Sequence, residues 1–525
     1  MQGEFRGDVS RDTFDPTKRF SRVLMQQGRV QLDSDWNEQN DILLHYLRSL
    51  TADLIGPHGG RAGSSLGFGL IANETDVDTL KDANGNALDE EQIRRLKASL
   101  RDSGFLLGIG RYYVDGLMCE SNDYLGFEEQ AGFPYVGSLS FEDIRDETGT
   151  FLAVLDVWER HVSCAEDGDI CEVALGGPDT ATRAQIVAAV IVPPPEKGGQ
   201  TLYDQQQLAD NIKKLKDAIA ASDQTAIENA RVALREFAEV VRLSLREPST
   251  GMLRARARIS GMPEGDCNIK PEAQYRGPEN QLYRVEINRS GIAWDGATDG
   301  EDPAGNAKTA ATFKWQRDNS SISLPIVSLE GDTVELAHLG RDTSRGLQVD
   351  DWVEIVADDL VLQGQPGPVR RIKAINPDEL TITLSEGVDQ GYDEDSTLHP
   401  YLRRWDQRRS DGESAENVLL VREGSAEDLN WIELEDGVQI QFPRNPDTNV
   451  NNRYRAGDYW LIPARVATGD VLWPKVAAGN RKVAKALPPH GIEHHYAPIA
   501  VISNDGTQKV VLEHDLRRKF GVLGG

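Results

Sequence analysis

The chain has 525 residues, of which 39% are hydrophobic and 27% are charged, and its formal net charge is −28. This length and composition are those of a globular protein with several domains. The negative charge argues against nucleic acid and anionic lipid as general partners, because both require a cationic surface. No apolar run is long enough for a membrane helix, and the N-terminus lacks the apolar segment of a secretory signal. We therefore expect cytoplasmic synthesis without membrane insertion.

The densest pattern in the sequence lies between Arg11 and Leu54. It predicts a helix that Asp33 or Ser34 caps and that ends before Gly56-Pro57. One face of this helix has a heptad pattern, which is typical of associating helices. The residues of this stripe are Trp36, Asn40, Leu43, Leu47, Leu50 and Leu54. Two interpretations stay open: the stripe packs on the chain's own domain, or it packs against another copy with Asn40 fixing the register.

The next part of the chain mixes helices and strands. Residues 82–89 have turn chemistry before a helix, and a plain turn is favoured over a calcium loop because the spaced carboxylates are incomplete. Strands are expected from Phe105 onward. Residues 61–200 therefore predict an α+β domain. Residues 201–248 predict an inserted helical hairpin with two apolar stripes separated by Ser222-Asp223.

The remaining sequence predicts mainly strands. Residues 249–400 alternate between apolar and polar side chains with short turns, as in a small barrel or sandwich, and residues 401–525 predict a C-terminal β domain. With an N-terminal docking segment over residues 1–60, the expected fold is α+β and mostly β.

Four cysteines are too few and too scattered for a disulfide scaffold. Cys164 and Cys171 bracket a short acidic loop and could pair across it. Because synthesis is expected in the cytoplasm, free thiols are the predicted state.

No motif for nucleophilic, phosphate-binding or zinc-dependent catalysis occurs in the sequence, so we predict no catalytic residue and no cofactor. The best candidates for metal or acid–base chemistry are His494 and His495, with Glu493 and His490 nearby. Adjacent strand residues point to opposite faces, which disfavours one shared metal, and histidines that bond the loop backbone are the alternative. The acidic loop over residues 295–306 is a second candidate cation site, and a hydrated loop is its alternative.

Three aromatic residues are candidates for stacking on sugar rings if they are exposed. They are Tyr459, Trp460 and Trp473. Tryptophans in alternating strands more often belong to the core, so core packing is the favoured interpretation.

The segment that begins at Phe14-Asp15-Pro16 and continues through residues 22–32 and 35–39 resembles a bacterial family. Its members are encoded in gene clusters for extracellular contractile injection systems, which are phage-tail-like particles. The same segment is more distantly similar to the start of certain phage baseplate and neck proteins. Further blocks of similarity follow in order, namely LIGPHGG (54–60), GRYYVDG (110–116), DVWERH (156–161), EVALGGPDTATRAQ (172–185), FKWQRDN (313–319), RRWDQ (403–407), WIELEDGVQIQF (431–442), YRAGDYWLIPAR (454–465) and GIEHHYAPIA (491–500).

This resemblance implies a non-enzymatic structural component of such a particle, in the baseplate periphery, shell or a fibre. The expected partners are sister subunits, as a homotrimer or another homo-oligomer, and baseplate or sheath proteins. The docking seam would consist of the heptad stripe together with Phe14. Release of the particle would place the protein outside the cell. Two alternatives stay open: a module that binds a cell-surface glycan or protein, and an enzyme or toxin cargo.

Overall fold

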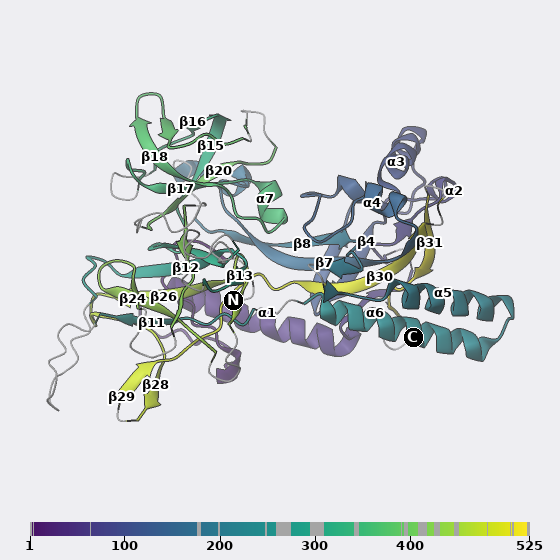
Figure 1. The fold of residues 1–525 in the computed structure, drawn as a ribbon, viewed down its shortest axis with the longest axis horizontal. Helices are drawn as coiled ribbons and strands as arrows, with labels where there is room; N and C mark the ends of the chain where they lie inside the picture. The colour runs from purple at the N-terminus through teal and green to yellow at the C-terminus, as the bar shows by residue number, and fades with distance from the viewer. Residues whose placement is uncertain are drawn as a thin grey trace, which may run out of the picture. The chain divides into compact units, whose positions relative to one another are not determined.

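The computed structural model describes residues 3, 5–63, 65–175, 180–197, 200–246, 249–258, 275–294, 309–340, 346–389, 391–392, 397–407, 417–424, 431–445, 451–479, 481–504, 506 and 509–521. Several antiparallel sheets and fewer helices make up the fold, which is α+β and mostly β, as the sequence predicts (Figure 1). No helix among the described residues is long and apolar enough to cross a membrane.

The chain forms two compact units, each assembled from segments that are far apart in the sequence. The first unit combines Met1–Asp41, Arg160–Gln185 and Pro248–Ile492. The second combines Ile42–Glu159, Ile186–Glu247 and Glu493–Gly525. The five predicted domains follow chain order, whereas these units are defined by contacts between distant segments.

The second unit is built on a sheet with the strand order β31-β30-β7-β8. These strands are β31 (Val510–Asp515), β30 (His495–Asn504), β7 (Gly149–Val162) and β8 (Arg183–Ile191). Strand β30 lies antiparallel to β7, so a C-terminal segment pairs with a strand from the first third of the chain (Figure 1). Apolar side chains of both strands, such as Leu155 and Ile499, belong to one core cluster.

Smaller sheets complete the second unit. One has the order β32-β1-β4-β5, and another the order β2-β3-β6. Their strands, with the short pair β9 and β10, are β32 (Lys519–Phe520), β1 (His58–Arg61), β4 (Gly110–Val114), β5 (Leu117–Ser121), β2 (Leu70–Ile71), β3 (Leu106–Leu107), β6 (Leu125–Gly126), β9 (Glu196–Lys197) and β10 (Gln200–Thr201).

Most helices lie in the second unit, and their caps follow the sequence. They are α2 (Glu74–Val77), α3 (Glu90–Ser103), α4 (Phe141–Asp146), α5 (Gln205–Ala220) and α6 (Gln224–Ser244). Asp89 and Gln92 form a capping box at the start of α3, so the predicted turn and helix are both confirmed. Asp223 caps α6 by accepting from the backbone N–H of Ala226, which confirms the predicted break of the hairpin.

Helix α1 (Asp33–Ile55) continues from the first unit into the second. It ends before Gly56, as the sequence predicts, and a single turn of 3-10 helix, η1 (Pro16–Lys18), precedes it.

The first unit has a central five-stranded sheet with the order β21-β14-β12-β26-β27. Its strands are β21 (Leu419–Leu420), β14 (Thr312–Gln316), β12 (Gln281–Arg289), β26 (Tyr459–Arg465) and β27 (Asp470–Val471). Residues at alternate positions of β12 point to opposite faces. Tyr283 and Val285 enter an apolar core, whereas Arg284 and Glu286 are buried on the other face.

A closed barrel with the strand order β15-β16-β19-β18-β17-β20 belongs to the same unit. All of its strands except β20 lie in the region 249–400, which was predicted to be barrel or sandwich-like. Its strands are β15 (Ser323–Glu330), β16 (Thr333–Leu336), β19 (Thr381–Leu384), β18 (Val369–Asn376), β17 (Trp352–Val356) and β20 (Tyr401–Trp405). The other elements of the unit are β11 (Arg254–Ala257), β13 (Gly291–Ile292), α7 (Asp358–Leu362), β22 (Glu423–Gly424), β23 (Ile432–Glu433), β24 (Val438–Pro443), β25 (Arg453–Tyr454), β28 (Lys475–Ala478) and β29 (Arg481–Ala484).

Candidate assembly surface

The apolar stripe of α1 is exposed along its length. The exposed fractions are 62% for Trp36, 50% for Leu43, 59% for Leu47, 56% for Leu50 and 62% for Leu54. Soluble chains rarely leave a contiguous row of large apolar side chains uncovered, and such rows mark interaction sites. Of the two interpretations of the stripe, packing on the chain's own domain is not what the structure shows.

The opposite side of α1 holds the helix on its own chain. Ile42 is 1% exposed, and the Arg48 guanidinium donates to both Glu159 carboxylate oxygens, at 2.9 and 2.7 Å. Gly116, in the turn between β4 and β5, lies against the Arg48 carbonyl, and a Cβ there would lie only 2.3 Å from that oxygen. The body therefore fixes one side of α1 and leaves the stripe bare.

The other two predicted seam residues, Asn40 and Phe14, differ in their exposure. Asn40 is exposed on the stripe, and its side-chain amide donates to the Trp36 carbonyl at 3.0 Å. Phe14 is half-buried, so it contributes less open surface than the leucines.

A second exposed apolar segment, residues 20–32, precedes the helix. Its exposed side chains are Phe20, Leu24, Met25, Val30 and Leu32. The Val23 N–H donates to the Gln39 side chain at 2.8 Å, so this segment runs against the first turns of α1. The bare surface is thus wider than the heptad stripe alone.

The candidate histidines have separate carboxylate partners. His494 Nδ1 lies 2.8 Å from Asp156, and His495 Nδ1 lies 3.0 Å from Asp115. His494 also packs against the Trp158 ring. No group of three or more metal-ligating side chains occurs among the described residues. The two histidines therefore bond different carboxylates, whereas the alternative interpretation expected bonds to the loop backbone.

The other candidate ligand sites lie elsewhere. The acidic loop over residues 295–306 falls outside the described residues. Tyr459, Trp460 and Trp473 are at most 6% exposed, so they are core residues and the sugar-stacking hypothesis for them is wrong. Trp460 and Trp473 donate their indole N–H groups to backbone carbonyls, which is how a buried tryptophan satisfies its polar atom.

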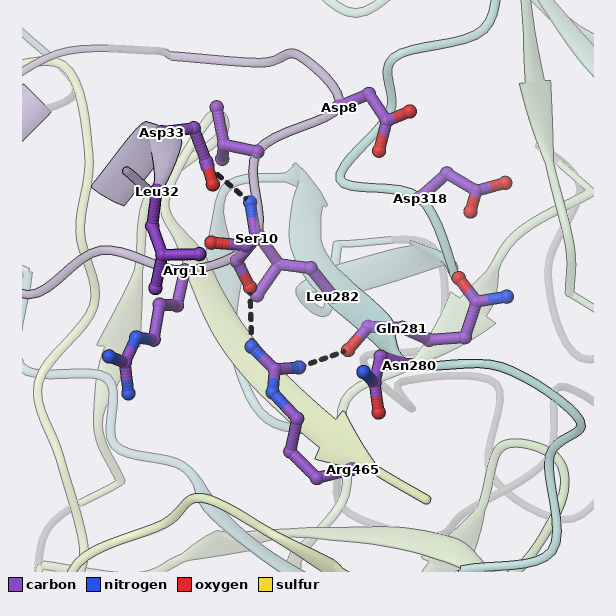
Figure 2. Close-up of a pocket in the computed structure, with 11 residues that line it drawn as sticks. Asp8, Ser10, Arg11, Leu32, Asp33, Asn280, Gln281, Leu282, Asp318 and Arg465 are labelled. Atoms are coloured by element: carbon purple, nitrogen blue, oxygen red, sulfur yellow. Dashed lines mark hydrogen bonds between the residues drawn. The ribbon is translucent and has the colours of Figure 1, made fainter. Parts of the chain in front are cut away.

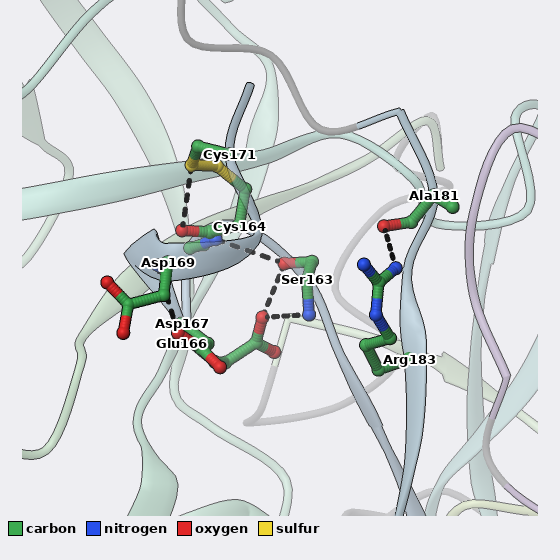
Figure 3. The surroundings of a disulfide bond; sticks show 9 residues. Ser163, Cys164, Glu166, Asp167, Asp169, Cys171, Ala181 and Arg183 are labelled. Atoms are coloured by element: carbon green, nitrogen blue, oxygen red, sulfur yellow. Dashed lines mark hydrogen bonds between the residues drawn. A yellow bond between two sulfur atoms is a disulfide. The ribbon is translucent and has the colours of Figure 1, made fainter. Parts of the chain in front are cut away.

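The prediction of free thiols in the acidic loop is also wrong, because Cys164 and Cys171 form a disulfide (Figure 3). The Ser163 N–H donates to the Glu166 side chain at 2.8 Å, and Asp167 caps the short turn Gly168–Ile170. These bonds fold the loop back until the two Cα atoms are 5.4 Å apart, a distance that a disulfide requires. The geometry of this loop therefore predicts the pairing of the two cysteines better than the expected cytoplasmic synthesis does.

An N-terminal arm, of which Gly3 and residues 5–10 are described, lies on the polar face of the central sheet of the first unit. Tyr459 donates to the Gly3 carbonyl at 2.9 Å, Arg284 to the Phe5 carbonyl at 3.0 Å and Asn319 to the Gly7 carbonyl at 3.1 Å. The Arg6 guanidinium lies 3.7 Å from Glu286. We call the donor side chains and Glu286 the arm groove.

A pocket of about 430 Å³ lies where the arm meets the start of α1 and strands β12 and β26 (Figure 2). The Arg465 guanidinium crosses it and donates to the Ser10 carbonyl at 2.6 Å. The Ser10 N–H donates to Asp33 at 2.7 Å, so the arm is also tied to the first residue of α1.

A model of a family of unknown function, DUF6519, matches residues 5–193 and 196–515. The chain belongs to the DUF6519 family. No curated protein and no solved structure matches it. The DUF6519 match begins inside the arm and includes all of α1, so both features lie in the part that the family model covers.

In this DUF6519 chain, the arm groove is the feature that sequence reasoning missed. The groove recognises main-chain carbonyl groups, which every residue has, so the arm itself needs no distinctive pattern. The charged residues at alternate positions of β12 were the available signal, because buried strands seldom carry Arg and Glu without partners.

Proposed function

We propose that this chain is a structural subunit of a phage-tail-like contractile injection particle and that it self-associates through the α1 stripe as a homotrimer. The observation that supports the proposal best is the bare heptad stripe, which the chain's own body leaves uncovered. The assignment to a contractile injection particle is inferred from the sequence resemblance alone. The protein acts as a scaffold, and no catalytic step is proposed.

The stripe suits a second copy of the same helix. Its spacing is that of helices that pack knobs into holes, and its flanks carry Leu44 and Tyr46, both exposed, with Asp53 as a charged flanking residue near the end of the helix. A face this wide exceeds the narrow seam of a two-stranded coil and fits three helices. Burying the exposed half of each leucine contributes on the order of 1 kcal/mol per side chain.

The negative charge of the chain should oppose this association. A net charge of −28 makes copies repel one another, so salt should strengthen the oligomer by screening. An interface held mainly by ion pairs would respond in the opposite way.

Purified particles test the scaffold role. Mass spectrometry should find the protein in a fixed ratio to other particle components, and electron microscopy of particles from a strain without it should show lost density or failed assembly. A variant with Leu47→Gln and Leu50→Gln should reproduce that defect, whereas a matched variant with Val232→Gln and Val240→Gln, exposed on α6, should assemble normally. Particles that are complete without the protein would contradict the proposal.

A further inference from the structure

The arm groove is a built site for a peptide segment. Its donors, Tyr459, Arg284 and Asn319, are at most 2% exposed, and each donates to one carbonyl of the arm, namely those of Gly3, Phe5 and Gly7. The Arg284 guanidinium also stacks on the Tyr459 ring, 3.6 Å from its centroid, which fixes both donors in place. Without an arm, each of these buried donors would lose the acceptor that the arm supplies, although Arg284 would keep its bond to Glu286, so an empty groove is unfavourable.

One arm side chain adds specificity. Arg6 enters a buried ionic cluster with Glu286, which also pairs with Arg284 at 2.6 Å and lies 3.5 Å from Lys314. Burial by itself would raise the pKa of the Glu286 carboxyl, but the surrounding cations lower it. The groove therefore favours a segment with an arginine at the position of Arg6.

The arm rests on the body as a separate segment. The pocket of about 430 Å³ lies between residues 8–11 and the body, and Figure 2 shows Arg465 reaching the arm across it. Hydrogen bonds to main-chain carbonyls, the Ser10 N–H bond to Asp33 and the ion pair of Arg6 hold the arm, and such contacts form equally well with an identical segment of another copy. The exposed apolar segment over residues 20–32 links the arm to α1, and it is long enough to span tens of ångströms.

We propose that residues 3–10 are an exchangeable arm, which fills the groove of its own subunit in the isolated chain and the groove of a neighbouring subunit in the assembled oligomer. This inference rests on the proposed self-association. It adds a mechanical link between copies, because each subunit then supplies a buried arginine and its carbonyl acceptors to the next one. The exposed side chains of residues 20–32 would be covered along the path between subunits.

A photo-crosslink in mixed oligomers tests the exchange. Phe5 is replaced by p-benzoylphenylalanine, and ¹⁵N-labelled and unlabelled chains are mixed as monomers at low salt, assembled in salt and irradiated. Exchange predicts that about half of the peptides that join residue 5 to the β12 region combine the two isotopes. If every such peptide carries one isotope in an assembled oligomer, arm exchange is overturned.

The crosslinker at two further positions provides the controls. The same crosslinker at Val9, also in the arm, should give the same mixed-isotope products and guards against a folding defect at position 5. At Tyr46, on the exposed side of α1, it should link copies whether or not the arm exchanges. Mixed products at Tyr46 without any at Phe5 or Val9 would reject the exchange and leave the proposed function standing. Mixed products at no position would reject both.

Discussion

Helix α1 and the α5–α6 hairpin carry the same kind of apolar stripe, but only the hairpin finds its cover within the chain. Leu208, Ile212 and Leu215 of α5 are at most 5% exposed, whereas Leu43, Leu47 and Leu50 of α1 are at least 50% exposed. Helical periodicity shows that a face is apolar and leaves open what covers it. The hairpin is therefore explained by the monomer, whereas the cover that we propose for α1 is another copy of the chain.

Removing the hairpin's packing should have the largest effect on stability. Leu234 of α6 is fully buried, and Leu234→Ala should lower the free energy of unfolding by about 2–5 kcal/mol because it leaves a cavity. Urea denaturation followed by circular dichroism measures the loss. Val240→Ala, at an exposed position of the same helix, should change it by less than about 0.5 kcal/mol. Equal effects of the two changes would contradict the packing of the hairpin.

The second largest loss of stability should follow from a change on the anchored side of α1. Arg48→Met leaves the mostly buried Glu159 carboxylate without its guanidinium and should cost about 1–3 kcal/mol in the same denaturation assay. Adding Glu159→Gln should restore part of the loss, since it removes the unpaired charge. If the single variant is as stable as the parent, the body does not hold α1 through this pair.

Acid should weaken the docking of the hairpin. Burial by itself would raise the pKa of Glu239 on α6, but the hydrogen bonds from His58 and Arg242 lower it to about 2. A carboxylate with a lowered pKa stabilises the fold above its ordinary value near 4.5 and loses this contribution as the pH falls toward 2. Burial also lowers the pKa of His58, whose contribution disappears as the pH falls below about 6.5.

Glu239→Gln separates the two contributions. The variant should lose about 1 kcal/mol at neutral pH, after solvent screening of this partly exposed group, and its stability should fall less steeply below pH 4.5. Thermal denaturation across the pH range measures both slopes. An unchanged slope below pH 4.5 would show that Glu239 does not cause the loss of stability in acid.

The smallest effect on stability should come from the stripe itself. Leu47→Gln replaces an exposed side chain with a good helix former, so the monomer's free energy of unfolding should change by less than about 0.5 kcal/mol. Denaturation at a concentration low enough to keep the chain monomeric measures this. A large loss would mean that the stripe packs on its own chain after all.

Local patterns predicted the elements well. Gly56-Pro57 placed the end of α1, Asp223 placed the start of α6, and the alternating strands predicted a β-rich fold. These features depend on residues close together in the sequence, whose capping and turn chemistry is readable without a structure.

Contacts between distant segments were not readable in the same way. The pairing of β30 with β7 joins residues more than 300 positions apart, and the arm groove combines residues 3–10 with Arg284 and Tyr459. Every residue has a backbone carbonyl, so the sequence of the arm does not indicate where the arm binds. The exposure of the stripe likewise depended on which side of α1 Ile42 and Arg48 anchor to the body.

Sedimentation velocity of the full chain, over micromolar concentrations at low and at physiological salt, tests the central claim most directly. We predict a reversible oligomer of three chains that strengthens with salt and that Leu47→Gln with Leu50→Gln reduces to a folded monomer. A chain that remains monomeric at every concentration and salt, or an oligomer unaffected by those two substitutions, would contradict assembly through α1.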